Sequence, residues 1–487
     1  MVVVRSRLKT KFGFGTGCST KSYLTKIDKL RVGRIMETTN QPNSKSEVQA
    51  KTLFDKLPST VNASQFEKIE SLPSIFANSL ANMPAQAADT ANSAMARFFR
   101  SQFIKTLGVL KHGCITLIDP IGQVVLGDEQ SDLRCTIRIA DLKSYTQIAM
   151  SGVNGSAQAY IDGLWATDNL SELIRIFVRN RSVLQEMDSG LTRFAQFVYR
   201  RWHARNKNTK QGSKRNIAAH YDLGNEFFRL FLDERMMYSS ALYLEGDDLQ
   251  TAADRKLQRI CDALELTEKD QVIEIGSGWG GFACYAAQQT GCRVTTVTIS
   301  QEQFNEAQAK AQRLGLEHLV EVNLQDYRDI TGEYDKLVSI EMIEAIGHQY
   351  LNTYFNKINH LLKKDGKALI QAIVIDDAEY EGALKRVDFI KRYIFPGGFM
   401  PCYSVINDFA AKNRLMLEDL HDMGLSYAQT LRDWRKRFYD QIETISTQGY
   451  DKSFQRMWEF YLCYCEGAFD ERATSVGQIL FRKQANT

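Results

Sequence analysis

The stretch from Val272 to Gly281, VIEIGSGWGG, combines residue types that could bind a nucleotide. Its apolar half predicts a buried strand, and the glycines that follow predict a tight turn opening a helix. Gly276, Gly278 and Gly281 satisfy the dinucleotide pattern G-x-G-x-x-G. The next predicted strand, however, does not end in the acid that an NAD enzyme places on its ribose hydroxyls. An NAD site and a purely structural turn therefore remain as alternatives to a different nucleoside ligand.

The position of an acid on the first strand separates these alternatives. Residues 274–280 read E-x-G-x-G-x-G, which resembles the first motif of class I methyltransferases, where the loop lets the backbone approach S-adenosylmethionine (SAM). Hydroxyl and amide groups at residues 298–303, TISQEQ, suit a neutral ribose, although they would equally serve as a helix N-cap. We interpret this region as a SAM site.

Two further strand ends carry polar groups. In residues 324–329, LQDYRD, the aspartate could accept a hydrogen bond from an adenine amino group and the tyrosine could cover its face. Residues 339–347, SIEMIEAIG, hold two acids, of which Glu344 lies at the carboxyl end of the fourth strand. Open α/β sheets bind ligands at that edge.

The elements that would position these groups are short apolar runs separated by helical patterns. Strands are expected at residues 271–275, 293–299, 319–323, 336–340 and 368–375, which predicts an α/β fold with a parallel, doubly wound sheet. Before it, strands at 114–117, 123–126 and 133–139 and a helix near 171–179 predict a small α+β domain. The expected division is a disordered lead-in at 1–94, this domain at 95–199, a basic linker at 200–215 and the domain with the candidate SAM site at 216–487.

Composition sets the outer limits. The chain has 487 residues with 61 Lys and Arg against 58 Asp and Glu, so nothing in the global charge favours a nucleic-acid partner. No apolar run approaches the roughly 20 residues of a membrane span. The nine cysteines lack paired C-x-x-C spacing, which argues against a disulfide framework or a structural zinc site and for a reducing compartment. No metal is expected.

Two segments are unusually basic. The first 36 residues carry nine Lys and Arg and a single acid, Asp28, which fits either a transit peptide or an upstream region ahead of a start at Met36. Residues 200–215 carry seven Lys and Arg and no acid. That run is either a solvated linker or a contact with an anionic bilayer, where each basic residue gains about 1 kcal/mol.

Seven motifs in order resemble those of cyclopropane-fatty-acyl-phospholipid synthases and mycolic acid cyclopropane synthases. They are HYDLGN at 220–225, YSSA at 238–241, the glycine loop, TISQEQ at 298–303, LQDYRD at 324–329, YIFPGG at 393–398 and GAF at 467–469. The resemblance is dense from Asn216 to Phe481. It implies a class I methyltransferase, Rossmann-like domain with a helical insertion over the lipid site.

The activity that the resemblance implies is transfer of the SAM methyl group to the cis double bond of an acyl chain in a membrane phospholipid, followed by ring closure. An alkene is a weak nucleophile, so the donor must be held in line with it. The carbocation that results requires a dry site lined by electron-rich rings. Candidates for these rings are Tyr238, Tyr393, Phe395, Tyr427 and Tyr461.

The resemblance also implies that a bound bicarbonate takes the proton. By position its ligands would be Glu344, Tyr427 and the backbone of Ile373, and the chain departs from the common pattern at two others. Ser240 stands where many members have Cys, and Gln371 where they have His, so a hydrogen-bond donor remains at each while the titratable His is lost. Cys465 matches a Cys regarded as an active-site residue, which we expect to line the site; a small buried core residue is the alternative.

The cofactor residues expected from these motifs are Tyr238, Ser239, Glu274, Gly276, Ser277, Gly278, Gly280, Thr298, Ile299, Ser300, Gln303, Gln325, Asp326 and Tyr327. The expected partners are phospholipids with unsaturated acyl chains at an anionic bilayer surface, with a homodimer as a possibility. The enzyme is expected in the cytoplasm, peripherally on the inner face of the membrane. The alternatives are a methyl-branching acyl or small-amine methyltransferase of the same family, and a lipid-binding protein without activity.

Overall fold

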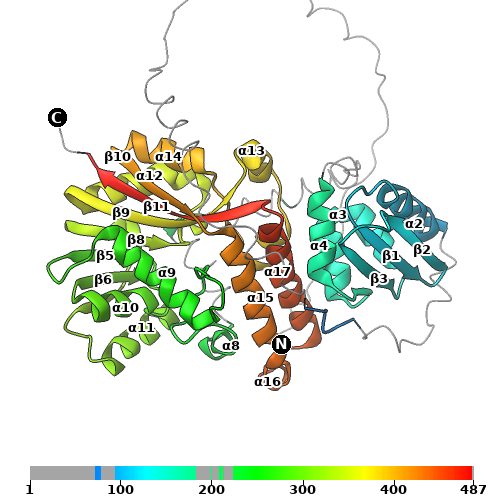
Figure 1. The fold of residues 1–487 in the computed structure, drawn as a ribbon, viewed down its shortest axis with the longest axis horizontal. Coiled ribbons are helices and arrows are strands. Elements are labelled where there is room, and N and C mark those ends of the chain that lie inside the picture. The colour runs from blue at the N-terminus through cyan, green and yellow to red at the C-terminus, as the bar shows by residue number, and fades with distance from the viewer. Residues whose placement is uncertain are drawn as a thin grey trace, which may run out of the picture. The chain divides into compact units, whose positions relative to one another are not determined.

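The computed structural model describes residues 72–77, 94–181, 199, 208–210, 212 and 223–484. Its larger sheet has seven strands in the order β10-β11-β9-β8-β5-β6-β7 (Figure 1). Their bounds are β5 Gln271–Ile275, β6 Arg293–Thr298, β7 Val320–Leu324, β8 Tyr334–Ile340, β9 Leu362–Ile375, β10 Leu415–Asp422 and β11 Thr474–Lys483.

Five of these strands confirm the prediction of a parallel core. β5 pairs in parallel with β6 and β8, β6 with β7, and β8 with β9. The prediction was incomplete at one edge, because β11 pairs antiparallel with β9 and β10 antiparallel with β11. The sheet is therefore mixed, an arrangement that is common among doubly wound folds.

Helices cover both faces of this sheet, which explains why its strands are apolar on both sides. Neighbouring residues such as Val272 and Ile273 enter different cores. The core of Val272 is closed by α9 Leu249–Leu264, α10 Gly281–Thr290 and α11 Gln301–Arg313, and that of Ile273 by α12 Leu351–Leu361 and α14 Tyr403–Lys412. A slip of one residue would exchange the two sets of side chains.

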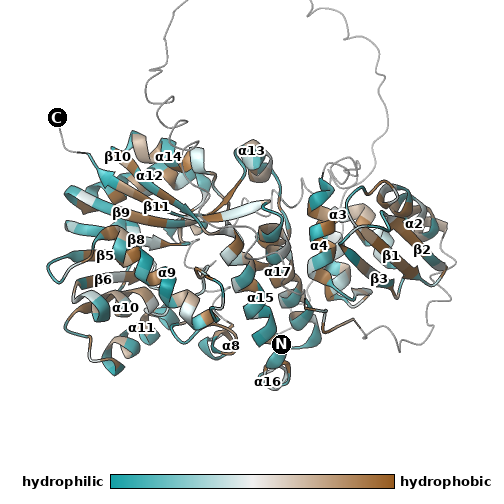
Figure 2. Cartoon of the chain, in the orientation of Figure 1, coloured by the Kyte–Doolittle hydropathy of each residue, from teal (hydrophilic) through white to brown (hydrophobic). Residues whose placement is uncertain are grey.

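Two long helices, inserted between β10 and β11, extend the fold beyond the sheet. They are α15 Gly424–Asp440 and α17 Lys452–Asp470, joined by α16 Ile442–Thr447. Arg435 and Glu466 bind each other between them with N–O distances of 2.8 and 3.0 Å, and both side chains are fully buried. Figure 2 shows hydrophobic residues along α17 and in the strands of both sheets.

Shorter helical segments follow β9, namely α13 Asp377–Lys385 and a π-helix at Ile390–Ile394.

The residues before the catalytic domain form a four-stranded sheet in the order β2-β1-β3-β4. Its strands are β1 Cys114–Asp119, β2 Gly122–Gly127, β3 Arg134–Ile139 and β4 Trp165–Thr167, with helices α2 Ala94–Leu107, α3 Lys143–Ile161 and α4 Leu170–Arg179. Helices α3 and α4 pack on α17. There, Tyr160 of α3 donates to the buried carboxylate of Glu459 at 2.5 Å, which also accepts from Tyr439 at 2.5 Å.

A short segment of the expected lead-in, residues 72–77, is held at this junction. Ser74 N donates to Asp168 O at 2.8 Å, and Arg435 donates to Leu72 O at 2.8 Å. The guanidinium of Arg456 lies 4.4 Å from the centre of the Phe76 ring. This segment therefore contacts both the smaller sheet domain and the helices α15 and α17.

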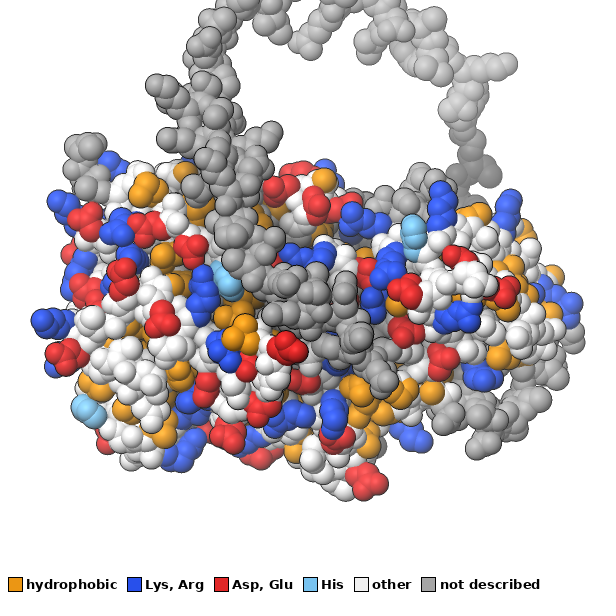
Figure 3. Space-filling model, viewed as in Figure 1, with side chains coloured by type: hydrophobic (Ala, Val, Ile, Leu, Met, Phe, Trp, Pro, Cys, Tyr) orange, Lys and Arg blue, Asp and Glu red, His pale blue; other side chains and the backbone are white. Residues whose placement is uncertain are grey.

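Most of the expected basic linker lies outside the described residues, as does the basic first segment. Of residues 200–215, the structure describes Asn208, Thr209, Lys210 and Gly212, and Lys210 pairs with Asp329. Figure 3 shows Lys and Arg side chains interspersed with Asp and Glu on the face in view. In the part of the chain that the structure describes, no helix is both long and apolar enough to cross a bilayer.

The Arg435–Glu466 pair generates a stability prediction. Removing one partner of a buried pair leaves the other charge uncompensated and costs about 3–5 kcal/mol. Arg432 lies 3.3 Å from Glu466, so we expect Arg435→Met to lower the free energy of unfolding by about 3 kcal/mol in urea titrations. The matched control is Lys436→Met, which removes an exposed pair with Asp440 and should cost less than about 0.5 kcal/mol. Equal losses of unfolding free energy in the two variants would contradict a stabilising role for the buried Arg435–Glu466 pair.

Candidate active site

The glycine loop between β5 and α10 has the geometry of a ligand cradle. Gly276, Gly278 and Gly280 have φ values of +99°, +48° and +80°, a region that disfavours side chains. A Cβ at Gly278 would meet nothing within 4 Å, whereas one at Gly280 would lie 3.1 Å from the backbone of Ala307. Gly280 is thus required for close packing on α11, and Gly278 faces open space where a ligand can approach.

The polar groups after β6 hydrogen-bond to one another. Thr298 Oγ1 donates to Gln303 Oε1 at 2.9 Å, and Ser300 Oγ accepts from Gln303 N at 3.3 Å. Ser300 is therefore the N-cap of α11, which is the alternative role that the sequence left open. Ile299, between Thr298 and Ser300, is half-buried.

The strand-end groups at β7 already have partners within the protein. Both oxygens of Asp326 bind Arg328, at 2.8 and 2.6 Å, and Oδ2 keeps a lone pair that could accept from an adenine amino group. Gln325 donates to Asp329 O at 2.8 Å. Tyr327 is half-buried, its hydroxyl has no partner in the described structure, and burial raises its pKa to about 12.

Two buried ionisable groups interact near the start of the loop, and only one of them was expected. Glu274 on β5 is buried and accepts from Thr296 at 2.6 Å, and desolvation raises its pKa to about 8. The ammonium of Lys256 on α9 is fully buried and donates to Ser239 Oγ at 2.8 Å. Desolvation lowers the pKa of Lys256 to about 8, against the attraction of Glu341, Asp233 and Glu274.

Four of the five aromatic candidates lie together. The hydroxyl of Tyr238 donates to that of Tyr461 at 2.9 Å, and the ring of Phe395 lies 6.4 Å from each of these two rings. Tyr238 stacks on Trp434 at 5.4 Å, and Tyr427 meets the edge of the same indole at 6.1 Å. We call Tyr238, Phe395, Tyr427, Trp434 and Tyr461 the ring cluster.

Tyr393 lies outside the ring cluster, contrary to expectation. Its hydroxyl donates to Gln158 on α3 at 2.7 Å, and the guanidinium of Arg392 lies 4.7 Å from its ring centre. The face of this ring is thus already occupied by a cation of the protein.

A carboxylate that the sequence analysis did not assign to the site lies at its centre. Glu341 Oε1 accepts from the backbone N of Ser240 at 2.9 Å and from Gln371 Nε2 at 2.8 Å. Its Oε2 accepts from the hydroxyl of Tyr427 at 2.8 Å. Glu341 thereby binds two of the side chains expected to hold bicarbonate, those of Gln371 and Tyr427, together with the backbone N of Ser240. The hydroxyl of Ser240, expected to face the anion, donates instead to Ala241 O at 2.9 Å.

Glu344 lies beside this centre. Its Oε1 accepts from the backbone N of Ile373 at 2.5 Å, and its Oε2 has no hydrogen-bond partner among the described residues. Glu341 and Glu344 are half-buried as residues, while Glu344 Oε2 itself is inaccessible to solvent. Desolvation, then the charge of Glu341, raises the pKa of Glu344 to about 8.

Cys465 is half-buried on α17, near Tyr427 and Tyr461. Burial raises the pKa of its thiol well above the usual range, and no cation offsets this. A thiolate nucleophile is therefore disfavoured, and a lining role agrees with the geometry.

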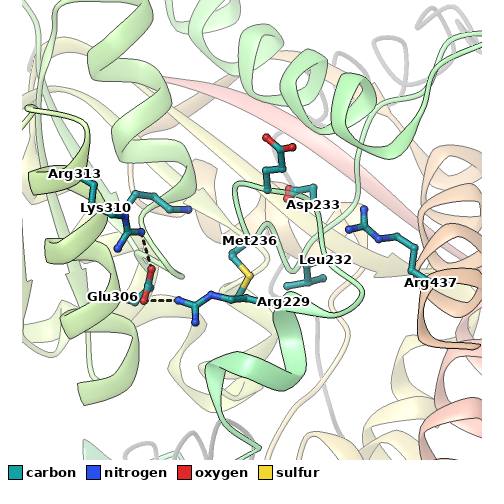
Figure 4. A pocket seen from close by; sticks show the side chains of 9 residues that line it. Arg229, Leu232, Asp233, Met236, Glu306, Lys310, Arg313 and Arg437 are labelled. Carbon is teal, nitrogen blue, oxygen red and sulfur yellow. Dashed lines mark hydrogen bonds and ion pairs between the residues drawn. The ribbon is translucent and has the colours of Figure 1, made fainter. Parts of the chain in front are cut away.

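An open pocket of about 500 Å³ is lined by other residues (Figure 4). Glu306 bridges Arg229 and Arg313 across it. Its lining contains none of the expected catalytic or cofactor residues.

Glu344 generates a prediction on pH. Its folded-state pKa of about 8 exceeds the unfolded value of 4.5, so the folded protein keeps a proton that the unfolded chain releases. The stabilisation of the folded state by protonated Glu344 is complete below about pH 4.5 and is lost as the pH rises through 8. Glu344→Gln removes this loss, so its free energy of unfolding should gain on the wild type between pH 5 and 8, by at most about 1.4 kcal/mol per pH unit. A difference that stays constant over this range in urea titrations would contradict the raised pKa.

Comparisons with known proteins agree with this architecture. Residues 208–479 match the family model "Mycolic acid cyclopropane synthetase". The chain is 34% identical over 335 residues to the tuberculostearic acid methyltransferase UfaA1 of Mycobacterium tuberculosis, covering 66% of this chain and 77% of the relative. It is 32% identical over 369 residues to the cyclopropane-fatty-acyl-phospholipid synthase of Escherichia coli, covering 75% of this chain and 92% of the relative.

Solved structures give the same family. The cyclopropane synthase MmaA2 from Mycobacterium tuberculosis aligns with a TM-score of 0.52 and 26% identity, covering 55% of this chain and 98% of that one. Mycolic acid cyclopropane synthase CmaA1, solved in complex with SAH and CTAB, aligns with the same score, identity and coverage. The seven-stranded sheet, the glycine loop and these matches together establish that the chain belongs to the mycolic acid cyclopropane synthetase family of SAM-dependent methyltransferases.

Proposed function

We propose that this protein transfers the methyl group of SAM to the cis double bond of unsaturated acyl chains in membrane phospholipids and closes a cyclopropane ring. The observation that carries the proposal is that Tyr427 belongs to two arrangements at once. Its hydroxyl donates to Glu341, and its ring packs on Trp434 in the ring cluster. A proton acceptor and a lining for a cation are thus joined in one place, as the chemistry requires.

Different parts of the site would serve different steps of the proposed reaction. The glycine loop faces open space at Gly278 and offers backbone for SAM, which supplies an activated methyl group when bound. The ring cluster presents electron-rich faces that stabilise a carbocation by cation–π attraction, about 2 kcal/mol or more in a desolvated site. The buried rings of Tyr427, Trp434 and Tyr461 would keep out the water that captures such a cation.

Bicarbonate does not fit the site as the chain builds it. Two of its expected donors, the side chains of Gln371 and Tyr427, are used by Glu341, and the hydroxyl of Ser240 donates to Ala241 O. We therefore assign no step to a bound bicarbonate.

A methyl-branched acyl product is the second candidate. It is favoured by the 34% identity to a relative named for tuberculostearic acid, a similarity in the same range as that to the cyclopropane synthase of Escherichia coli. Both products follow from the same carbocation and differ in which carbon loses the proton. The N-terminal sheet domain argues against a small amine as substrate, because such a substrate would not require it.

The setting that we propose is the cytoplasmic face of the membrane, with peripheral attachment. Residues 95–199 would act as a lipid-associated domain, and the basic residues of 200–215 as a contact with anionic lipid. A homodimer is part of the same proposal.

The product is testable directly. Expression in cells that contain unsaturated phospholipids should add one methylene per modified acyl chain, measured by mass spectrometry of the lipids. Mild catalytic hydrogenation then separates the candidates, because it adds hydrogen to an unsaturated branched chain and leaves a cyclopropane intact. Unmodified lipids in cells with folded, SAM-binding protein would instead favour a lipid-binding protein without activity.

The cofactor site is testable by one substitution. Gly278→Val places a β-branched side chain in the open space at φ +48°, so SAM affinity measured by calorimetry should fall by more than about tenfold, or 1.4 kcal/mol. Gly315→Val is the matched control, since Gly315 also has a positive φ of +67° and an open Cβ direction but lies after α11, away from the loop. Unchanged affinity in Gly278→Val, or an equal loss in both, would contradict the assignment.

A further inference from the structure

A series of hydrogen bonds that begins at Arg259 determines which groups donate to Glu341. Arg259, whose guanidinium can only donate, binds Gln478 Oε1 at 2.8 Å. This turns the amide nitrogen of Gln478 toward Gln371 Oε1, at 3.1 Å. The amide nitrogen of Gln371 must then point to Glu341, which it meets at 2.8 Å. The orientation of both amides thus follows from the guanidinium.

Glu341 is therefore surrounded by groups that donate. Ser240 N cannot accept a hydrogen bond, and Gln371 presents its donor for the reason just given. The hydroxyl of Tyr427 completes the set on the other oxygen. Such a surrounding favours the ionised carboxylate, which accepts on both oxygens.

The backbone at Glu341 is unusual for this residue type. Its φ of +48° lies in the left-handed region, which costs a non-glycine residue roughly 1–2 kcal/mol. Glycine would avoid this cost, so the side chain is retained at the expense of stability. Strain of this kind is concentrated at functional sites.

From this geometry we propose that the Glu341 carboxylate, built into the chain, takes the place of a bound bicarbonate and accepts the proton released when the acyl product forms. The proposal rests on the proposed methyl transfer to an alkene. It extends that function by naming the base, and it predicts an enzyme that does not depend on bicarbonate.

The step balances in atoms and electrons. The S–CH3 bond of SAM breaks and leaves its electron pair on sulfur, while the alkene pair forms a new C–C bond to the methyl carbon. The remaining alkene carbon becomes cationic. A C–H bond of the former methyl then breaks, its electron pair closes the ring, and its proton passes to Glu341, which becomes a neutral carboxylic acid. The proton leaves to solvent after the product, which restores the carboxylate.

Neighbouring charges suit this role. The buried ammonium of Lys256 attracts Glu341 and is itself held by Ser239. Desolvation outweighs the hydrogen bonds at Glu341 and raises the pKa of this carboxyl above its ordinary value. A base gains strength as its pKa approaches the working pH.

The first test measures turnover of the purified full-length enzyme on vesicles of unsaturated phospholipid with SAM. Buffer purged of carbon dioxide is compared with the same buffer containing a series of bicarbonate concentrations. We expect equal rates at every concentration. A wild-type rate that falls on purging and returns with bicarbonate would overturn the inference.

Two variants remove the carboxylate in different ways. Glu341→Gln keeps the shape, and its amide can accept from Ser240 N and Gln371 and donate to Tyr427, so folding and SAM affinity should be retained while turnover falls by about 10²-fold or more. Retained turnover in a folded Glu341→Gln variant would overturn the inference.

Glu341→Gly relieves the backbone strain and leaves the three donors free. Turnover should fall as far as in the Gln variant and be restored, with saturation, by added bicarbonate or formate, since these anions have the same acceptor oxygens. Failure of both anions to restore any turnover in the folded variant would count against an anion site at this position. The matched control is Glu265→Gly, at φ +54° on the exposed end of α9, which should leave turnover unchanged with or without bicarbonate.

These outcomes separate the two proposals. If the wild type binds SAM but forms no methylated lipid at any bicarbonate concentration, the proposed function fails. If it forms product only with bicarbonate, the proposed function stands and the role of Glu341 alone is overturned.

Discussion

A carboxylate deep inside a protein is stable only if donors surround it, and Glu341 obtains its donors from three separate parts of the chain. Ser240 precedes α9, Gln371 lies on β9 and Tyr427 on α15. An unpaired charge in such a place would cost several kcal/mol, so the relative positions of these elements are tightly constrained. The strand pairing in the sheet meets this constraint. Ile340 pairs with Gln371, which brings Gln371 beside the next residue, Glu341, and Gln371 in turn pairs with Gln478.

Much of the fold could be predicted from local sequence. The five parallel strands alternate between two apolar cores, so each gives a short continuous apolar run that is easily recognised. The antiparallel edge was not predicted, since β10 is half-exposed over most of its length and has no such run. Its residues Asp419 and His421 face partners on β11 and α9 that only the folded sheet brings near.

The site divides in the same way. The glycine loop is one continuous segment, and its turn geometry follows from residue type alone. The network around Glu341 is not local: its donors lie 30, 86 and 101 positions away along the chain. A signal did exist, since residues 339–347 hold two acids three positions apart after a predicted strand, and only Glu344 was assigned. For Tyr393 the sequence suggested a site residue that the structure places elsewhere. Nothing in its motif reveals that its hydroxyl binds Gln158 and that Arg392 lies over its ring.

The line of hydrogen bonds from Arg259 through Gln478 and Gln371 to Glu341 also has a consequence for how such a site can change during evolution. The orientation of each amide follows from the group before it, so an apolar residue in place of either glutamine leaves a buried donor or acceptor of each neighbour without its partner. Leucine at position 371, for example, would deprive the amide nitrogen of Gln478 of its acceptor and Glu341 of one of its donors. The four positions should therefore be inherited as a block, and related chains that lack the carboxylate at position 341 should differ at 371 and 478 as well.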